Sequence, residues 1–481
     1  MTLLELFEGI SFRCPTRTRE DIGDRMVEEL LTRPKTGVEN ALFVVTRTPL
    51  HDGEDDVRTA YLAGCRLFLC RRELDIGEHA VQLIVKEPEH LLGVLAARLL
   101  GHPSRRMRVF AVTGSVGKSC VALLLARILR DAGCRTGLLC SDGVDVGEGM
   151  HPLPPHLPNG AEVQDYLAKM RGNGMDYAVL EFSGYQLQHG AAAGLSPYAV
   201  CVSSVAPRGV DGVDLACYHS ATERLLSLGA PVCVLPVQAT LASNADRVIR
   251  VGRGGDYALD DFFTVHTPND GYVSHFSLCE GEERLPFKHP SPFRFAAENA
   301  LCAAALARVA GVPYDVIAKS FSGYTVPGRM ECFYHCGRLV CVDACFSPED
   351  LARSLQALSP LTQGRLCVLL GSVGGRALER RVPLARTAAF YADRVYLTAD
   401  DPDFESPFAI CREMREAMAE PERAEIIPDR RLAIHAAVRD MRPGDVLLLA
   451  GKGNLQLQLV HGERRPFPER ELAVAALAEH L

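Results

Sequence analysis

The sequence predicts an α/β fold in which two doubly wound parallel sheets follow a smaller α/β unit. Short apolar runs alternate with helical stretches in two series, which Pro327-Gly328 separates. The runs lie at residues 109–112, 137–140, 177–180, 198–202 and 231–237 in the first series, and at residues 339–342, 366–370, 395–397 and 446–449 in the second. Apolar runs separated by helices are typical of parallel strands covered on both faces.

The segment ahead of these series has shorter elements of its own. We predict strands at residues 41–46 and 65–70, with a helix at residues 58–63 between them. A longer helix ends at Leu100, and the Gly-His-Pro-Ser sequence at residues 101–104 breaks it. A chain of 481 residues suggests three domains at about 150 residues each. We expect them at residues 1–105, 106–327 and 328–481.

Composition excludes several classes of function. The net charge of −8 gives no general affinity for nucleic acid or an anionic membrane surface. The N-terminus lacks the basic and long apolar segments of a signal peptide, and no apolar run is long enough to span a membrane. The 17 cysteines are scattered, and those at 332, 336, 341 and 345 lack the paired spacing of a zinc site. We expect a monomeric cytoplasmic protein with reduced cysteines.

The strongest chemical signal is a glycine-rich loop between a predicted strand and a predicted helix. The strand at residues 109–112 leads into Thr113 and the sequence GSVGKS, and the helix at residues 120–129 follows. The loop residues that we expect to bind a nucleotide are Thr113, Gly114, Ser115, Gly117, Lys118 and Ser119. Glycines let backbone N–H groups face a phosphate, the lysine reaches the outer phosphates, and the serine hydroxyl binds magnesium.

Glu181 is a second candidate for the nucleotide site. It directly follows the apolar run at residues 177–180. A carboxylate at the C-terminal edge of a parallel sheet points into the crevice where ligands bind. Glutamate in such a place is otherwise a solvated loop residue, and the neighbouring phosphate loop favours a magnesium ligand.

Motifs along the whole chain resemble those of the Mur ligase family. The phosphate loop and Leu180-Glu181-Phe182-Ser183 resemble its central domain. Later segments match in order: Phe295 to Asn299, Val326 to Glu331 around Arg329, Val342-Asp343, Gly374-Gly375, Thr398 to Pro402 and Ala450 to Gly453. In the first domain, Thr32-Arg33, Ala41 to Phe43 and Asp52-Gly53 resemble the module for a uridine nucleotide. The most similar branch adds the third amino acid of the peptidoglycan stem.

The resemblance implies a three-domain ligase that uses ATP and Mg²⁺. ATP phosphorylates a carboxylate of a UDP-linked muramoyl peptide or similar acceptor, and an amino acid then displaces phosphate. It implies that Lys118 holds the phosphates, that Ser119 and Glu181 hold magnesium, and that Asn299, Arg329 and Asp343 face the nucleotide. Thr32, Arg33 and Ser183 would bind the acceptor. Asp400, Asp401, Asp403, Gly451 and Lys452 would bind the amino acid.

The central domain departs from the family pattern at several positions. The segment D-H-L-D-Y-H aligns with Asp214 to His219, where His219 remains a catalytic candidate. The family's carbamylated lysine aligns with Glu223, which keeps a negative charge on a shorter arm. We expect Glu223 to act on magnesium without carbon dioxide; its alternative role is a charge on the helix surface. Ser204 stands for an asparagine, Phe346 for a histidine, and His156-Leu157-Pro158 for T-T-P.

The amino-acid site departs further. The family's D-N-P-R is Asp400-Asp401-Pro402-Asp403, which reverses the charge where arginine reads a diaminopimelate carboxylate. The family's G-K-G-H-E is Gly451-Lys452-Gly453-Asn454-Leu455, without the final glutamate. We therefore expect a substrate other than diaminopimelate.

Two functions remain open from the sequence. One is an active ligase with unusual substrates, favoured by the joint presence of Lys118, Ser119 and Glu181 with Asn299 and Arg329. The other is a catalytically impaired relative that binds nucleotide or a partner protein, favoured by the altered metal and substrate positions. A generic nucleotide hydrolase explains neither outer domain.

Overall fold

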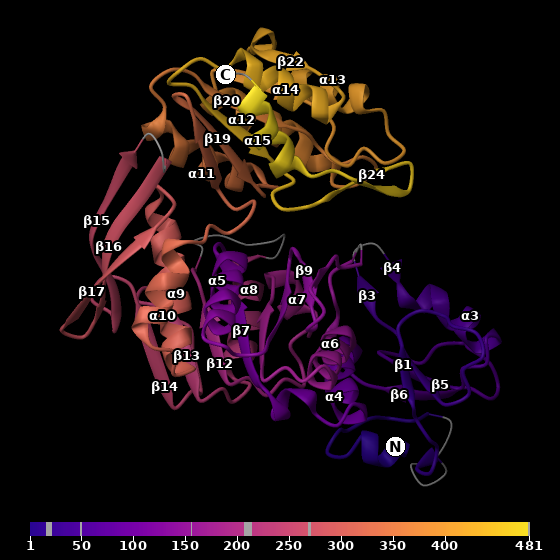
Figure 1. Ribbon diagram of the computed structural model, residues 1–481. Coiled ribbons are helices and arrows are strands. Elements are labelled where there is room, and N and C mark those ends of the chain that lie inside the picture. The colour runs from indigo at the N-terminus through magenta and orange to yellow at the C-terminus, as the bar shows by residue number, and fades with distance from the viewer. Residues whose placement is uncertain (16–21, 49–50, 155, 206–213, 268–270, 480–481) are drawn as a thin grey trace. The chain divides into compact units, whose positions relative to one another are not determined.

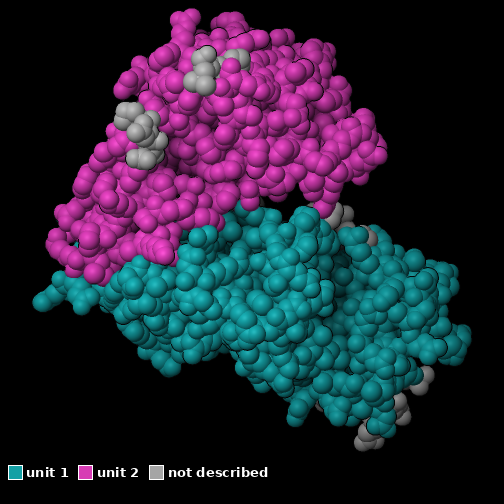
Figure 2. All heavy atoms as spheres, viewed as in Figure 1, with its two compact units in different colours: residues 1–258, 279–283, 299–317 teal, residues 259–278, 284–298, 318–481 magenta. Residues whose placement is uncertain are grey.

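The computed structural model describes residues 1–15, 22–48, 51–154, 156–205, 214–267 and 271–479. The chain forms two compact units, shown in different colours in Figure 2. Unit 1 comprises residues 1–258, 279–283 and 299–317, and unit 2 comprises residues 259–278, 284–298 and 318–481. Among the described residues, no helix is both long and apolar enough to cross a membrane.

Unit 1 begins with a small parallel sheet in the strand order β1-β2-β5-β6 (Figure 1). These strands are β1 (Glu29–Leu31), β2 (Ala41–Val44), β5 (Leu67–Cys70) and β6 (Val81–Ile84), and α3 (Val57–Leu62) and α4 (Pro88–Leu99) belong to the same segment. Every residue of β2 and β5 is buried, which agrees with their uninterrupted apolar sequence. The predicted strands and helices of this segment are confirmed.

The second sheet of unit 1 carries the phosphate loop. Its neighbouring parallel strands follow the order β8-β11-β7-β12-β13-β14. They are β8 (Thr136–Cys140), β11 (Tyr177–Glu181), β7 (Arg108–Thr113), β12 (Ala199–Val202), β13 (Val232–Pro236) and β14 (Arg247–Val251). The helices are α5 (Lys118–Asp131), α6 (Gly160–Gly172), α7 (Gly184–Gln188) and α8 (Leu215–Leu226). All five apolar runs predicted for this region are strands, and they lie side by side in the order β8-β11-β7-β12-β13.

The sheet of unit 2 is doubly wound, as the second apolar series predicts. Its order is β18-β19-β23-β20-β21-β22, in which β18 is antiparallel to β19 and the other pairs are parallel. The strands are β18 (Glu331–His335), β19 (Arg338–Asp343), β20 (Leu366–Leu370), β21 (Arg394–Leu397), β22 (Ala424–Ile426) and β23 (Val446–Ala450).

A layer of helices covers each face of this sheet, and alternate strand residues pack against one layer or the other. Cys341, Val368 and Leu448 pack with α11 (Pro348–Leu358), α12 (Arg381–Tyr391) and α13 (Pro407–Glu416). Val340, Leu369 and Leu447 pack with α14 (Arg430–Asp440) and α15 (Glu469–Glu479) on the other face. Because successive strand residues point to opposite faces, a continuous apolar run is needed to bury both. The predicted fold class is therefore confirmed.

Two features of the fold lie outside the sequence predictions. The strands β15 (Tyr257–Thr267), β16 (Gly271–Glu280) and β17 (Glu283–His289) were not predicted, because their mixed polarity gives no buried-strand signal. Cys332 and Cys341 occupy directly paired positions of β18 and β19 and form a disulfide. The expectation that these cysteines are reduced apolar residues is therefore wrong for this pair, because antiparallel pairing brings their side chains together.

Candidate functional site

The phosphate loop joins β7 to α5 at the C-terminal edge of the unit 1 sheet. Gly114 and Gly117 have φ values of 142° and 81°, a region that L side chains rarely adopt. A Cβ atom at Gly114 would overlap Ser203, and one at Gly117 would overlap the amide of Asn299. Glycine is therefore required for both backbone conformation and space, and Asn299 is placed against the loop from α9 (Arg294–Val309).

The end of β12 holds the loop in place. Ser115 N donates to Ser204 O at 3.1 Å, and Val116 N donates to Ser204 Oγ at 2.9 Å. Ser203 Oγ donates to Val116 O at 2.6 Å. Thr113 is fully buried, and its hydroxyl donates to Phe182 O at 2.9 Å. Thr113 and the serine pair thus fix the loop's backbone, although the sequence analysis placed Thr113 among the nucleotide-binding residues.

Ser119 and Glu181 meet at the first turn of α5. Ser119 Oγ donates to Glu181 Oε1 at 2.8 Å, and Ser141 N donates to Glu181 Oε2 at 2.9 Å. Lys118 Nζ donates to Ser115 O across the loop at 3.3 Å. Only 7% of Glu181 is exposed, so both carboxylate oxygens are held in fixed positions. A hydroxyl and an ordered carboxylate beside a phosphate loop are the oxygen donors that Mg²⁺ binds together with phosphate.

The turn between β8 and β9 (Gly143–Asp145) adds two residues that the sequence analysis missed. Ser141 Oγ lies 3.0 Å from Ser119 Oγ, and it donates to Asp142 Oδ1 at 3.4 Å. Asp142 therefore brings a second carboxylate to the magnesium side of the loop. A signal existed in the sequence, because Ser-Asp-Gly directly follows the buried run at residues 137–140 and must lie at the same sheet edge as Glu181.

The candidates on α7 and α8 are placed elsewhere. Ser183 caps α7, where its hydroxyl accepts from Gln186 N at 3.2 Å. Glu223 accepts a hydrogen bond from Ala242 N at 3.2 Å, in the segment that follows β13. His219 keeps a buried Nε2 without a partner among the described residues. The structure links neither Glu223 nor His219 to Ser119 or Glu181 by a hydrogen bond, so their catalytic roles stay predictions.

A polar cavity lies in unit 1 between α4, α7 and α8, with an empty volume of about 970 Å³. Arg71 pairs with the buried Glu89 at 2.8 Å, and Arg224 Nη1 donates to His90 Nε2 at 2.5 Å. Desolvation, with Arg224 nearby, lowers the pKa of His90, so the neutral ring accepts a hydrogen bond from the arginine.

Thr32 and Arg33, which the resemblance assigns to the acceptor, directly follow β1 in the small sheet, and Arg33 is exposed.

In unit 2, Asp343 ends β19 and anchors the turn that carries Arg329. Met330 N donates to Asp343 Oδ1 at 3.0 Å, and Ser354 Oγ donates to Oδ2 at 2.6 Å. Desolvation raises the pKa of Asp343, although the residue as a whole is only partly buried. Gly328 has a φ of 62°, and a Cβ atom there would overlap the backbone at Asn454. The motif around Arg329 is thus tightly packed against the segment after β23.

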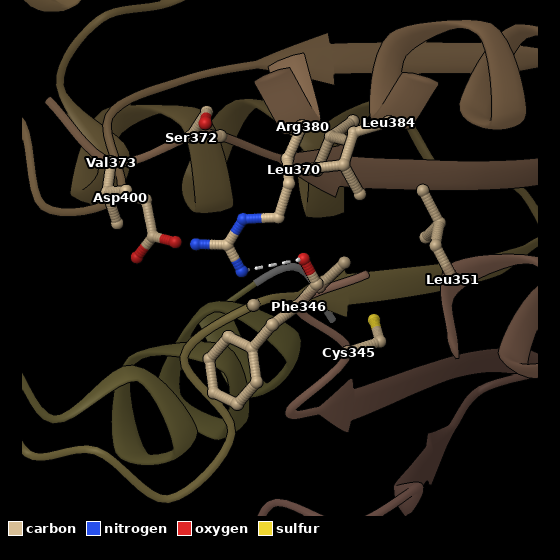
Figure 3. Close-up of a pocket in the computed structure, with 12 residues that line it drawn as sticks. Cys345, Phe346, Leu351, Leu370, Ser372, Val373, Arg380, Leu384 and Asp400 are labelled. Atoms are coloured by element: carbon tan, nitrogen blue, oxygen red, sulfur yellow. Dashed lines mark hydrogen bonds between the residues drawn. The ribbon is translucent and has the colours of Figure 1, made fainter. Parts of the chain in front are cut away.

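A second cavity opens at the C-terminal edge of the unit 2 sheet (Figure 3). Arg380 and Asp400 face it from opposite elements, and Leu351, Leu370 and Leu384 form an apolar wall. Gly451 also lines it, and a Cβ atom there would lie 3.2 Å from Asp400 Oδ2. The sequence analysis predicted Asp400 and Gly451 as residues that bind the amino acid, and it did not single out Arg380.

The remaining residues predicted for the amino acid have partners within the protein. Lys452 is 1% exposed, and its Nζ lies 2.8 Å from Asp401 Oδ1 and 3.3 Å from Asp400 Oδ1. Arg376 pairs with the other oxygen of Asp401 at 3.5 Å. Asp403 Oδ1 accepts from Gly462 N at 2.7 Å, which anchors the hairpin of β24 (Leu457–Val460) and β25 (Glu463–Pro466). Lys452, Asp401 and Asp403 thus have partners within unit 2, and the contacts of Lys452 and Asp401 lie beside Asp400.

Comparison with known proteins decides the family. Residues 112–307 match the Mur ligase middle domain, and residues 328–453 match the Mur ligase glutamate ligase domain. The chain is 31% identical to UDP-N-acetylmuramoyl-L-alanyl-D-glutamate–2,6-diaminopimelate ligase from Alkalilimnicola ehrlichii, over 95% of this chain and 96% of that protein. The chain belongs to the Mur ligase family. The ligase of the same name from Halalkalibacterium halodurans is 27% identical over 92% of each chain.

Solved structures agree with this family in fold. A UDP-N-acetylmuramoyl-L-alanyl-D-glutamate–2,6-diaminopimelate ligase matches with a TM-score of 0.67 at 21% identity, over 100% of this chain and 99% of that one. The MurF ligase from Thermotoga maritima in complex with ADP matches with a TM-score of 0.54 at 17% identity, over 95% and 98% of the chains. The resemblance predicted from the sequence motifs, and the class of ligase that it implies, are confirmed.

Proposed function

We propose that this Mur ligase joins a carboxylate of a UDP-linked muramoyl peptide, or a similar acceptor, to an amino acid at the expense of ATP. The observation that carries the proposal is the contact of Ser119 with Glu181 beside Lys118 in a chain of this family. A buried carboxylate aligned with the loop serine is the arrangement that holds Mg²⁺ on the phosphates of ATP during phosphoryl transfer. The three predicted domains, at residues 1–105, 106–327 and 328–481, would serve the acceptor, ATP and the amino acid.

The reaction requires positioning and charge neutralisation more than acid–base chemistry. Lys118 and the loop's backbone hold the transferring phosphate, while Asn299 packs on Gly117 and keeps the loop's shape. A carboxylate oxygen of the acceptor attacks this phosphate, ADP leaves, and an acyl phosphate results. The amine of the amino acid then attacks the acyl carbon, inorganic phosphate leaves, and the nitrogen loses a proton.

The residues beside the loop fit a magnesium ion. Ser119 and Glu181 would bind it directly, and Asp142 would accept hydrogen bonds from its water. The ion would neutralise charge that develops on the phosphates. The sequence analysis also predicted Glu223 as a magnesium ligand; its oxygen accepts a hydrogen bond from Ala242 N, and the proposed magnesium site does not include it. The cavity between α4, α7 and α8 is the candidate site for the acceptor's peptide, and the reaction would take place in the cytoplasm.

The test measures ADP release with ATP, a UDP-N-acetylmuramoyl dipeptide and a panel of amino acids, each omitted in turn. The proposal requires that release depend on both the acceptor and an amino acid, and that the product gain the mass of one residue. ADP binding without turnover on any acceptor would instead support the catalytically impaired relative. Release that is independent of the acceptor would indicate simple hydrolysis.

A further inference from the structure

A fully buried ion pair joins the first residues of two helices in unit 2. Arg430 begins α14 and is 1% exposed, and Glu469 begins α15 and is 0% exposed. Arg430 Nε donates to Glu469 Oε2 at 2.5 Å, and its Nη2 donates to Oε1 at 3.0 Å. The two hydrogen bonds hold the guanidinium plane in one orientation beneath the sheet.

The outer nitrogens of Arg430 also bind the main chain at the ends of two strands. Nη2 donates to Ala450 O at 2.9 Å, and Nη1 donates to Ala399 O at 3.3 Å. Ala450 ends β23, and Ala399 lies two residues beyond the end of β21. These strands are not neighbours, because β20 lies between them in the sheet. The rigid fork of the guanidinium therefore sets the position of one strand end relative to the other.

The residues that directly follow these two carbonyls are those that the resemblance assigns to the amino acid. Asp400 follows Ala399, Gly451 follows Ala450, and both line the cavity of unit 2. Lys452 links the same two segments a second time, since its Nζ lies 3.3 Å from Asp400 Oδ1. A shift of either strand end would thus displace the site residues next to it.

Stability alone gives no reason for this ion pair. Two charges taken out of water lose their hydration, and apolar side chains of similar volume often stabilise a core as well or better. Apolar side chains cannot, however, fix the spacing between two carbonyl oxygens, whereas a planar fork of donors can. Such spacing matters in a reaction whose rate depends on placing the reacting groups to within about 1 Å.

We propose that the Arg430–Glu469 pair is a positioning element of the ligase reaction. It holds residues 400–401 against residues 451–452, so that the amine of the incoming amino acid is placed for attack on the acyl phosphate. The inference rests on the proposed ligase function and adds two residues that act through others. Formation of the acyl phosphate at the phosphate loop of unit 1 does not use this spacing, so the pair should affect the second step and spare the first.

The experiment measures the two steps separately in the full-length protein. With ATP and a UDP-N-acetylmuramoyl dipeptide, the best amino acid of a panel reports the complete reaction. Hydroxylamine in place of the amino acid reports the first step: its nitrogen attacks the acyl carbon, phosphate leaves, and the nitrogen loses a proton to give a hydroxamate. Hydroxylamine at high concentration reacts from solution and needs no amino-acid site. The readout is the ratio of kcat/KM for the amino acid to the rate of hydroxamate formation.

Two variants change the pair in different ways. Arg430→Lys keeps a positive charge beside Glu469 and loses the fork, whereas Arg430→Met combined with Glu469→Gln removes both charges. We expect each variant to lower kcat/KM for the amino acid about 10- to 100-fold, with the hydroxamate rate within about threefold of wild type.

The matched control is Arg365→Lys at the opposite edge of the same sheet. Arg365 and Asp445 directly precede β20 and β23, and they pair at 2.7 Å. This change makes the same replacement in an ion pair that does not touch the ends of β21 and β23 at the cavity. We expect it to leave the ratio of the two rates unchanged.

Several results would overturn the inference while leaving the ligase function intact. They are a ratio within about twofold of wild type in both variants of the pair, an equal fall of the amino-acid and hydroxamate rates, or loss of cooperative unfolding in both variants. The last two would show that the pair serves the fold in general. Absence of acceptor-dependent ADP release in the wild-type protein would instead count against the ligase function itself.

Discussion

At the residue scale, the phosphate side of the site depends on a few polar atoms with defined partners. Ser119, Ser141 and Glu181 are linked through hydrogen bonds of 2.8 to 3.0 Å. Ser141 Oγ also donates a hydrogen bond to Asp142 Oδ1, which adds a second carboxylate to this network. Because such groups are ordered before a ligand arrives, little reorganisation is needed when phosphate and magnesium bind. Substitutions here should change catalysis with small effects on stability.

We expect Lys118→Ala to lower ligase turnover at least about 100-fold, since it removes the charge that supports the transferring phosphate. Lys118 is partly exposed at the first turn of α5, so the unfolding free energy should stay within about 0.5 kcal/mol of wild type. The measurements are initial rates of ADP release and urea unfolding. Arg127→Ala on the same helix is the control, because Arg127 is exposed and pairs with Asp131 on the helix surface. Normal turnover in Lys118→Ala would refute the phosphate-loop assignment.

The two glutamates of the central sheet region can be compared by one chemical change. Glu181→Gln should cost at least about tenfold in turnover and raise the magnesium requirement, because a charged ligand becomes neutral at nearly constant volume. Glu223→Gln should cost less than about threefold, because its carboxylate is bonded to Ala242 N and not to Ser119 or Glu181. The measurement is turnover across a magnesium titration. A large loss for Glu223→Gln would restore it as a metal ligand.

The same assay tests the predicted independence from carbon dioxide. Glutamate is ionised at neutral pH without modification, whereas a lysine would need to react with carbon dioxide to gain a negative charge. We expect equal rates in degassed buffer and in buffer with added bicarbonate. Stimulation by bicarbonate would show that a lysine outside the Glu223 position fills this role.

At the scale of elements, β17 ends on a histidine whose environment is unusual. His289 is 3% exposed, and neither ring nitrogen has a partner among the described residues. Desolvation lowers its pKa to about 4. The folded protein therefore holds this ring neutral, whereas the unfolded chain takes up a proton near the unperturbed pKa of about 6.5. Below a pH of about 6.5 the unfolded chain binds a proton at His289 that the folded protein does not. The unfolding free energy therefore falls as the pH drops from about 6.5 toward 4.

We expect acidification from pH 7.5 to 5 to cost about 2 kcal/mol through His289 alone. The replacement His289→Leu should reduce the acid-induced fall in the unfolding temperature, since it leaves no group to protonate. The exposed His151→Leu variant is the control and should leave that fall unchanged. Parallel pH profiles for wild type and His289→Leu would contradict a buried neutral imidazole.

At the scale of the whole molecule, two compact units divide the chemistry. The phosphate loop and the polar cavity of α4, α7 and α8 belong to unit 1, and the Arg380–Asp400 cavity belongs to unit 2. The disulfide also belongs to unit 2, where it closes a short loop between residues nine apart. We expect the two units to unfold in separate cooperative transitions, so that a change in the stability of one can be measured against the other.

Reduction of the disulfide should destabilise unit 2 selectively. Cross-linking a loop of this size stabilises a protein by about 2 to 3 kcal/mol through the entropy of the unfolded chain. Scanning calorimetry with and without reductant should show one transition moving to lower temperature while a second stays. The Cys332→Ser variant should reproduce the shift and lose its response to reductant. An equal shift of all transitions would contradict two separately cooperative units.

The sequence by itself determined the order of elements and the phosphate side of the site. Apolar runs at residues 109–112 and 177–180 indicated buried parallel strands, whose C-terminal ends carry the glycine loop and Glu181 to the same edge of a sheet. Local backbone rules then required Gly114 and Gly117 to keep positive φ values. The apolar runs and the glycine positions each depend on residues that are close together in the sequence, so the sequence alone is enough to recognise them.

Tertiary structure alone decided which distant side chains meet. Asn299 lies against Gly117, Asp142 reaches Ser119 through Ser141, and Arg380 shares a cavity with Asp400. Packing also showed that Asp403 and Lys452 are committed within the protein, whereas their sequence motifs predicted contact with a substrate. The physical reason is that partnership between charges depends on distance and burial in space. Neither quantity is encoded in the local spacing of residues along the chain.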